Sequence, residues 1–252
     1  MQRVDLLLVE LGFAKSRTHA QRLIKNGKVQ ANLKGQWQAI TKPGLKVEAN
    51  IELKVAEDPA DRFVSRGALK LLGALEHCKA DLTGKVAIDV GQSTGGFSDC
   101  LIQNGISKVV GIEVGYDQLA DKLRDDPRVV CYEGMNAREL PAEKLLAHTD
   151  GSGFDLAVMD VSFISQTKIL PSLIPLMKPE GLLISLVKPQ FEVGKSGIGS
   201  GGIVRDESLY PKVKENIINC CELLGVNVTD YLESPITGGD GNREFLLIGQ
   251  KR

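Results

Sequence analysis

The first 55 residues carry apolar positions in two different periods. Helical spacing relates the apolar residues of two short segments, first Val4, Leu7, Leu8 and Leu11, then Ala20, Leu23 and Ile24. Ser16 is placed to cap the second helix and Gly27 to end it. Residues 28–32 and 46–55 alternate apolar and polar positions as strands do, with a turn at Gly35 between them. The pattern therefore predicts a small α+β domain.

Farther along the chain, strand-like apolar runs alternate with helical ones. The runs that predict strands are 85–91, 108–114, 128–135, 154–162, 181–191, 226–235 and 244–250. The helical segments are centred near residues 70, 98, 120, 143, 170 and 214. This alternation predicts an α/β fold of the Rossmann type, in which a seven-stranded, mostly parallel sheet is covered by helices on both faces.

An acidic segment that contains proline, residues 57–61, separates the two patterns. We therefore expect one small domain over residues 1–57, a linker over 58–64 and a larger domain over 65–252.

Composition and charge narrow the class of protein. The chain has 252 residues, of which 42% are hydrophobic, and a net charge of −1, which excludes collagen-like and largely disordered proteins. Residues 1–46 hold nine Lys and Arg against two acidic residues, a net charge of +7, so residues 47–252 carry −8. A basic head favours a polyanionic partner, although a solvated surface face gives the same pattern.

The cysteines and the apolar runs indicate in which cellular compartment the protein is expected. The five cysteines are odd in number and have no metal-ligand spacing, and no run of 18 apolar residues occurs. Asp5 and Glu10 interrupt the first apolar run, unlike the core of a signal peptide. We therefore expect a cytoplasmic protein with reduced thiols, no metal and no membrane partner. The oligomeric state stays open.

A glycine-rich turn follows the first strand of the larger domain. Its spacing, G-x-x-x-G-G from Gly91, differs from the G-x-G-x-x-G of dinucleotide enzymes. Glu113 ends the next strand, where a carboxylate can accept both hydroxyls of a ribose, and Asn136 follows the third. The pattern favours S-adenosylmethionine, and NAD or a structural role stay open. The expected cofactor contacts are Asp89, Gly91, Ser93, Thr94, Gly95, Gly96, Phe97, Glu113, Asn136 and Asp160.

Four charged residues lie at unusual positions. Lys70 is early in the helix before the first strand, Asp160 and Lys188 end buried strands, and Glu244 opens the last strand. Each alone could be a strand-end residue that reaches water. Together at one edge of a sheet, two lysines and two carboxylates indicate catalysis. Nearby, the glycines of residues 193–204 predict a mobile flap beside this edge or a long surface loop.

The amino-terminal segment resembles the small RNA-binding domain named after ribosomal small-subunit protein four. The matching residues are Arg3-x-Asp5, Leu11, Ala14-x-Ser16-Arg17, Ala20, Leu23-Ile24 and Gly27-x-Val29-x-x-Asn32. The resemblance implies that the two helices and the next strand present basic side chains to structured RNA. The residues in question are Arg3, Lys15, Ser16, Arg17, Arg22, Lys25 and Lys28.

From residue 3 to about 248 the chain is similar to the TlyA (haemolysin A) family, whose second domain is FtsJ-like. The motifs are Ser65-Arg66-Gly67-Ala68-x-Lys70-Leu71, Asp89-x-Gly91-x-Ser93-Thr94-Gly95-Gly96-Phe97, Asp160-x-Ser162-Phe163-Ile164-Ser165, Val187-Lys188-Pro189-Gln190-Phe191-Glu192 and Gly241-Asn242-x-Glu244-Phe245. The resemblance implies a class I methyltransferase fold. It also implies methyl transfer from S-adenosylmethionine to a ribose 2′-hydroxyl of ribosomal RNA, with cytidine the expected nucleoside.

In the wider FtsJ-like group a Lys-Asp-Lys-Glu set at these positions is catalytic. We expect Lys188 to act as base or oxyanion partner, oriented by Asp160, and Lys70 to help electrostatically, oriented by Glu244. Gln92 departs from the family, because a small residue is usual there, and Thr237-Gly238-Gly239 stands where the family tends to place proline.

Three other functions remain as alternatives. One is an RNA-binding protein whose second domain is inactive, and another is an NAD-dependent oxidoreductase, which the glycine spacing disfavours. The third is a membrane-lytic protein, as the name haemolysin suggests, but no long basic amphipathic helix supports it.

Overall fold

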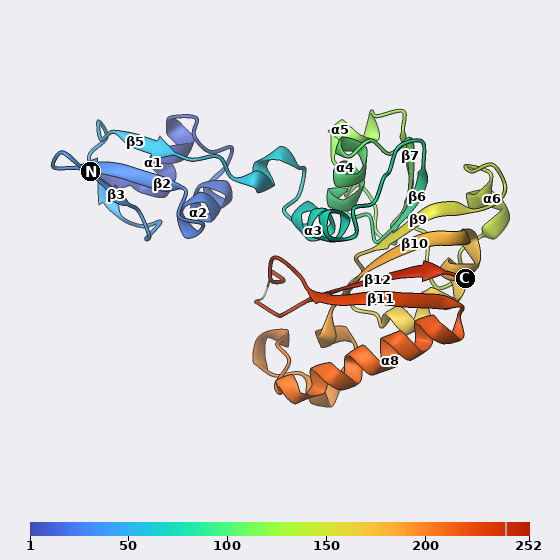
Figure 1. Cartoon of the computed structure of the whole chain (residues 1–252). Coiled ribbons are helices and arrows are strands. Elements are labelled where there is room, and N and C mark those ends of the chain that lie inside the picture. The colour runs from blue at the N-terminus through green and yellow to red at the C-terminus, as the bar shows by residue number, and fades with distance from the viewer. Residues whose placement is uncertain (240) are drawn as a thin grey trace. The chain divides into compact units, whose positions relative to one another are not determined.

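The structure is a computed structural model and describes residues 1–239 and 241–252. These residues form two units, unit 1 (Met1–Arg62) and unit 2 (Phe63–Arg252) (Figure 1). The segment expected to be a linker, 58–64, spans the division between them.

Unit 1 places two helices against small antiparallel sheets. Its elements are β1 (Gln2–Arg3), α1 (Val4–Glu10), α2 (Arg17–Lys25), β2 (Val29–Leu33), β3 (Gln36–Ala39), β4 (Lys46–Val47) and β5 (Leu53–Val55). One sheet has the order β3-β2-β5, and β1 pairs with β4. The apolar stripes of both helices form its buried core with Val29 and Ala31 of β2.

Two local predictions have different outcomes in unit 1. Ser16 caps α2 as predicted, because its hydroxyl accepts a hydrogen bond of 3.2 Å from the His19 N–H. Residues 46–55, whose alternation predicts strand structure, divide into two short strands. The Ile51 N–H donates to the Glu48 carbonyl at 3.2 Å and closes a turn, so that β4 and β5 join different sheets.

Unit 2 contains the seven-stranded sheet, which confirms the predicted fold class. The strands are β6 (Val86–Val90), β7 (Lys108–Ile112), β8 (Val129–Tyr132), β9 (Phe154–Met159), β10 (Met177–Val187), β11 (Val226–Glu233) and β12 (Phe245–Lys251). Their order is β11-β12-β10-β9-β6-β7-β8, and β12 runs antiparallel to β10 and β11 whereas the other neighbouring pairs are parallel. The start of β12 therefore lies at the edge where the parallel strands end.

Helices occupy all six segments predicted for unit 2. They are α3 (Ala68–Cys78), α4 (Gly96–Gln103), α5 (Asp121–Arg124), α6 (Ala142–Leu146), α7 (Leu170–Leu173) and α8 (Tyr210–Leu223). Short 3-10 segments cover Pro59–Arg62, Gln166–Lys168, Ile174–Leu176, Pro189–Phe191, Lys195–Gly197, Ser200–Gly202 and Glu207–Leu209. Among the described helices, none has the length and apolar character needed to cross a bilayer.

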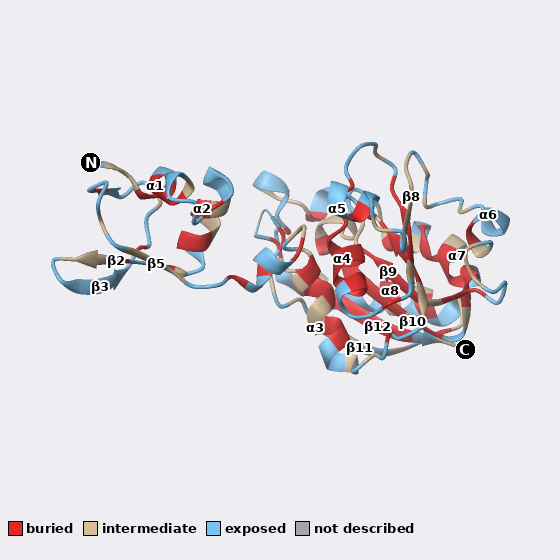
Figure 2. Ribbon diagram, turned by 90° about the horizontal axis from the view of Figure 1, so that it is seen from above, coloured by how far each residue is buried: buried red, intermediate tan, exposed pale blue. Residues whose placement is uncertain are grey.

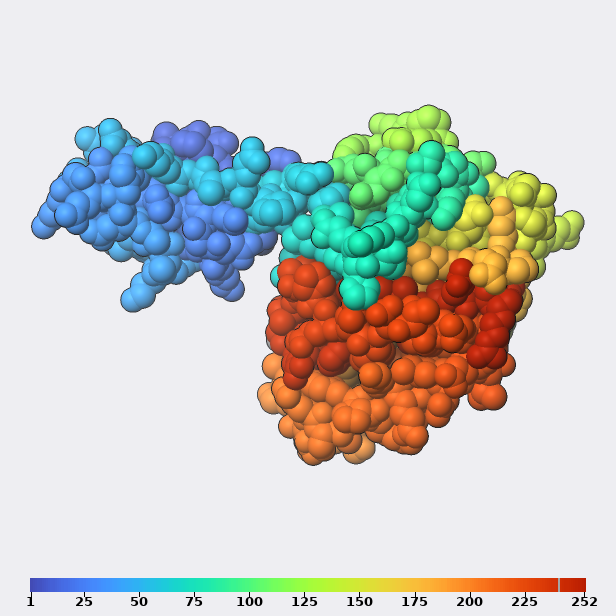
Figure 3. Space-filling view, viewed as in Figure 1, coloured from blue at the N-terminus to red at the C-terminus, as the bar shows by residue number. Residues whose placement is uncertain are grey.

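The sheet of unit 2 is buried on both faces. Alternate residues of a strand enter different cores: Ala157 and Met159 of β9 pack with α7 and α8, whereas Leu156 and Val158 pack with α3 and α4. Buried residues accordingly fill the strands and the inner sides of these helices (Figure 2). The surface of α3 also lies directly beside the carboxyl-terminal strands (Figure 3).

The glycine-rich segment 193–204 is folded in the structure. Ile198 and Val204 form an antiparallel bridge, and the Gly199 N–H donates to the Ile203 carbonyl at 2.7 Å. The buried Asn242 holds this segment next to the start of β12, because its amide donates to the Gly202 carbonyl at 3.0 Å and accepts from the Val204 N–H at 3.2 Å.

Candidate active site

A cavity of about 160 Å³ opens in unit 2 where β6 ends in its glycine-rich turn. Ligand pockets usually measure about 300–1,000 Å³, so a cavity of this size can hold only part of a nucleoside cofactor. Six predicted cofactor contacts line it, namely Gly91, Ser93, Thr94, Gly96, Phe97 and Asp160. Five further residues do so as well, Ser65, Gly67, Gln92, Ser162 and Lys188.

The glycines of the turn have separable roles. Gly91 has a φ of +84°, and a Cβ there would lie 2.5 Å from the Asp160 carbonyl oxygen. Only glycine therefore lets the ends of β6 and β9 approach so closely beside the cavity. Gly95 does not line the cavity. A Cβ on Gly95 would lie 2.3 Å from Leu123 of α5 and 2.8 Å from Leu119, so this glycine makes room for these two leucines.

Asp89 lies beneath the turn rather than on the cavity wall. Its side chain is fully buried, Oδ2 accepts a hydrogen bond of 2.7 Å from Ser98, and Oδ1 has no hydrogen-bond partner among the described residues. Burial raises the pKa of Asp89 to about 7, against the lowering effect of the Ser98 bond.

Gln92 extends the same hydrogen-bond chain. Its side-chain amide donates to Ser98 at 2.7 Å, and only 2% of the residue is exposed. The amide fits because residue 111 is glycine, since a Cβ there would lie 2.0 Å from it. The unusual size of Gln92 is therefore accommodated by β7 and does not fill the cavity.

Glu113 and Asn136 bond to nearby backbone. The Glu113 carboxylate accepts hydrogen bonds of 2.8 Å from the N–H groups of Ser93 and Gly115, and so fixes the turn that borders the cavity. Asn136 is exposed and accepts from the Arg138 N–H at 3.0 Å, as a turn residue does. Neither residue lines the cavity.

The four charged residues form two separate ion pairs. Lys188 Nζ lies 2.5 Å from Asp160 Oδ1 and donates to the Ser162 hydroxyl at 3.0 Å, and all three residues line the cavity. Lys70 Nζ lies 2.5 Å from Glu244 Oε2, with side chains only 9% and 3% exposed. This second pair is buried and does not line the cavity.

The turn before α3 brings the two pairs to the same edge of the sheet. Gly67 precedes α3, and a Cβ on it would lie 4.0 Å from Asp160 Oδ2. Glu244 reaches this edge because it precedes the antiparallel strand β12. The Lys188 ammonium, compensated by Asp160, thus lies on the cavity wall with the glycine turn, and the Lys70–Glu244 pair lies at the same edge of the sheet. Positive charge at this edge suits a reaction in which negative charge develops on oxygen.

Phe163 is a residue that sequence reasoning passed over. It is 91% exposed with a φ of +65°, rare for a bulky residue, and its ring lies 5.2 Å from that of Phe191, centroid to centroid. The sequence does contain a signal for this residue, because Phe163 follows Ser162 in the motif Asp160-x-Ser162-Phe163-Ile164-Ser165 that carries the family resemblance.

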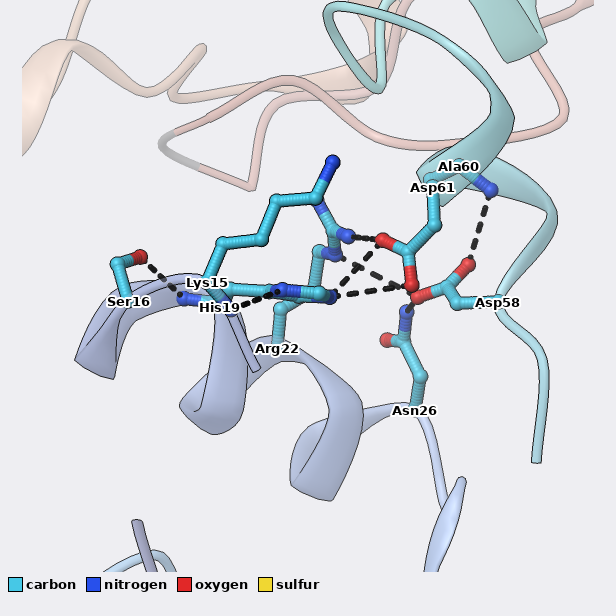
Figure 4. Close-up of polar contacts among 8 residues, drawn as sticks. All are labelled: Lys15, Ser16, His19, Arg22, Asn26, Asp58, Ala60 and Asp61. Atoms are coloured by element: carbon cyan, nitrogen blue, oxygen red, sulfur yellow. Dashed lines mark hydrogen bonds and ion pairs between the residues drawn. The ribbon is translucent and has the colours of Figure 1, made fainter. Parts of the chain in front are cut away.

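The candidate RNA-binding residues of unit 1 differ in how free their charges are. Arg3 and Arg17 lie 2.9 and 3.0 Å from the carboxylate of the buried Asp5, and the hydrogen bond from Arg3 holds its pKa well below the usual range. Arg22 pairs with Asp58 and Asp61 (Figure 4). Lys15, Ser16 and Lys25 are exposed and Lys28 is half-buried.

Comparisons with known proteins agree with this architecture. Residues 63–251 match the FtsJ-like methyltransferase family, and residues 2–50 match the S4 domain. The chain is 44% identical to YqxC of Bacillus subtilis, a candidate rRNA methyltransferase, over 98% of this chain and 84% of that protein. It is 41% identical to the 16S/23S rRNA (cytidine-2′-O)-methyltransferase TlyA of Mycobacterium tuberculosis, over 97% of this chain and 88% of that protein.

A solved structure is similar along nearly the whole chain. It is a candidate hemolysin from Streptococcus thermophilus, 39% identical, with a TM-score of 0.73, and the match covers 99% of this chain and 88% of that one. The resemblances read from the sequence are thus confirmed, and the chain belongs to the TlyA family of FtsJ-like methyltransferases.

Proposed function

We propose that the protein transfers a methyl group from S-adenosylmethionine to a ribose 2′-hydroxyl of ribosomal RNA, with cytidine as the target nucleoside. The observation that carries the proposal is the Lys188–Asp160 pair on the wall of a cavity formed by a glycine turn. The S4 domain of unit 1 and the rRNA-modifying relative support RNA as the substrate.

The residues around the cavity fit such a cofactor. Ser93 and Thr94 offer polar groups in the turn, and Gly91 and Gly96 line the cavity without side chains. Asp89 Oδ1, without a partner among the described residues, is an acceptor beneath the same turn. When bound, S-adenosylmethionine supplies an electrophilic methyl group on a sulfonium.

Lys188 is the residue best placed to act on the attacking hydroxyl. It would take the hydroxyl proton or stabilise negative charge on oxygen while the carbon–oxygen bond forms and the carbon–sulfur bond breaks. Asp160 and Ser162 fix the position of its amine through contacts of 2.5 and 3.0 Å. Lys70, held by Glu244, would add positive potential, and the proton finally leaves to solvent.

Phe163 offers a surface for the target base. Its exposed ring follows Ser162 directly and is braced by Phe191, and a nucleobase stacks favourably on such a ring. Stacking there would hold the ribose of the same nucleotide close to Lys188.

The Lys188→Ala variant tests the assignment. Methyl transfer from labelled S-adenosylmethionine to unmodified ribosomal subunits should fall by about 10²–10⁴-fold, since proton transfer or oxyanion stabilisation is lost. Cofactor affinity by calorimetry should stay within a few-fold. Lys212→Ala, on the exposed face of α8, is the matched control. Near-normal turnover of Lys188→Ala would refute the role.

Two further measurements separate the alternatives. Mass spectrometry of the labelled ribosomal RNA would identify the methylated nucleotide, and a label on a base would contradict transfer to ribose. A protein with an inactive second domain would fail to bind S-adenosylmethionine in a titration. Lysis of red cells by pure, detergent-free protein would instead support the lytic function.

A further inference from the structure

Three side chains of α2 meet the acidic segment that follows β5. His19, Arg22 and Asn26 extend from the helix and the residue that ends it, and Asp58 and Asp61 face them (Figure 4). All five residues belong to unit 1. The segment that the sequence presents as a linker is therefore partly bound to the basic helix.

Of the two carboxylates that face α2, Asp61 is the one that another anion can replace more easily. Its carboxylate pairs with Arg22 Nη2 and lies 2.9 Å from His19 Nε2. The Lys15 N–H donates to His19 Nδ1 at 3.1 Å, which directs Nε2 of the ring toward Asp61. The side chains of Arg22 and Asp61 are 30% and 34% exposed, so water and ions reach this pair.

Asp58, in contrast, is integrated into the local fold. It is 4% exposed, accepts from Asn26 at 2.9 Å and caps its own turn by accepting from the Ala60 N–H at 3.1 Å. Arg22 Nε lies 3.4 Å from Asp58 but makes no hydrogen bond with any described residue. The guanidinium thus keeps a donor that the two carboxylates do not satisfy.

We propose that His19 and Arg22 form a binding site for an RNA phosphodiester, in which the Asp61 carboxylate occupies the place of the phosphate and is displaced when RNA binds. The proposal rests on the proposed function and adds to it one anchoring site and the group that competes for it. A carboxylate and a phosphodiester both offer two oxygens and one negative charge to a guanidinium fork.

The energetics favour such an exchange. Exposed ion pairs contribute little to stability, so Asp61 is lost at small cost. RNA phosphate brings the added gain of counterion release and a further contact with the exposed Lys15, whose backbone N–H bonds to His19. Asp58 stays held by Asn26 and by the Ala60 N–H, so Asp61 can leave, and its backbone N–H can open, while the residues before it stay in place.

The Asp61→Asn variant gives the sharpest test, because it removes the competing charge at constant size. Affinity of the full-length protein for an unmodified 16S rRNA transcript should rise about two- to fivefold at moderate salt, as expected for the loss of one exposed pair. Glu57→Gln is the matched control, an exposed residue of the same segment with the same change of charge. If Asp61→Asn binds no more tightly than Glu57→Gln, the proposal is overturned.

A double variant tests whether the effect of Asp61 on RNA affinity depends on Arg22. Arg22→Ala should weaken binding, and adding Asp61→Asn to it should restore nothing, because the group for which Asp61 competes is gone. If Asp61→Asn raises RNA affinity equally with and without Arg22, the gain comes from the change in net charge alone, and the proposed site is contradicted.

Hydrogen exchange tests the displacement in the unmodified protein. The Asp61 N–H donates to the Asp58 carbonyl at 2.8 Å, and this amide should exchange faster when the rRNA transcript is bound. Unchanged or slower exchange would show that the segment stays in place. Methyl transfer measured on the same samples separates this outcome from failure of the proposed function, since transfer can persist without displacement.

Discussion

Both units bury an aspartate completely, yet the two carboxylates are in opposite electrostatic situations. Asp5 in unit 1 accepts hydrogen bonds from Arg3, Arg17 and Gln21, and these hold its pKa well below the usual range. Asp89 in unit 2 makes no ion pair with any described residue, and burial raises its pKa to about 7.

The difference shows what each unit does with buried charge. Unit 1 uses Asp5 to order two arginines of the candidate RNA surface, so its charge is part of the fold. Unit 2 keeps Asp89 beneath the candidate cofactor turn with one oxygen unpartnered among the described residues, at a cost in stability. A buried carboxylate thus supports the fold where cations pair with it and lowers stability where one of its oxygens has no partner.

Removing Glu244 from the buried Lys70–Glu244 pair would leave a buried cation without its partner, much as Asp89 is a buried carboxylate with one oxygen unpartnered among the described residues. Glu244→Ala leaves the Lys70 ammonium buried and unpaired, so we expect the free energy of unfolding to fall by about 3–5 kcal/mol in urea titrations. The double variant Lys70→Met/Glu244→Leu should regain much of this stability while methyl transfer stays lost. Recovery of activity in the double variant would contradict a catalytic role for the pair.

The raised pKa of Asp89 predicts a pH dependence of stability. Between about pH 4 and 7 the unfolded chain loses the Asp89 proton while the folded chain keeps it, so stability falls as the pH rises and changes no further above about 7. Asp89→Asn keeps an acceptor for Ser98 and should stabilise the protein at pH 8 by about 2–4 kcal/mol. Circular dichroism melts would measure it, with the exposed Asp125→Asn as control. If the stability of Asp89→Asn falls with rising pH as steeply as that of the wild-type protein, Asp89 is not the group with the raised pKa.

Replacing Asp5 should change the stability less than replacing Asp89, and in the opposite direction. Its depressed pKa means that its contribution is present above about pH 4 and is lost as the pH falls toward its folded value. Asp5→Asn should destabilise unit 1 by about 1–2 kcal/mol at pH 7. Trp37, the single tryptophan of the chain, lies in β3 and reports unit 1 by fluorescence. Glu48→Gln is the control, and equal stability of both variants would show that Asp5 is not needed.

The period of apolar residues was sufficient to predict most of the fold. In β9 the strand signal is continuous, because both faces of the sheet are covered, and the helical segments fall between such runs. The split of residues 46–55 was missed, since two- and three-residue strands are too short to show a period. The pairing of β12 between β10 and β11 is set by long-range contacts that local pattern does not contain.

The site was predictable in its residue types but not in its contacts. Motif resemblance brought Lys70 and Glu244 together although 174 positions of chain separate them in the numbering. The direction of Gln92 depends on Gly111 of a neighbouring strand, which no local pattern reveals. Similarly, the acidic residues after β5 are typical of a linker, and only the fold shows that α2 binds them.

The reversed direction of β12 has a consequence during synthesis. Lys70 emerges early in translation, but its partner Glu244 is made 174 residues later and is carried to the reaction edge only when β12 inserts between β10 and β11. A nascent or truncated chain can therefore assemble the glycine turn and still lack one acid of the set. Chemical competence would then depend on the insertion of β12 and not only on the folding of the candidate cofactor turn.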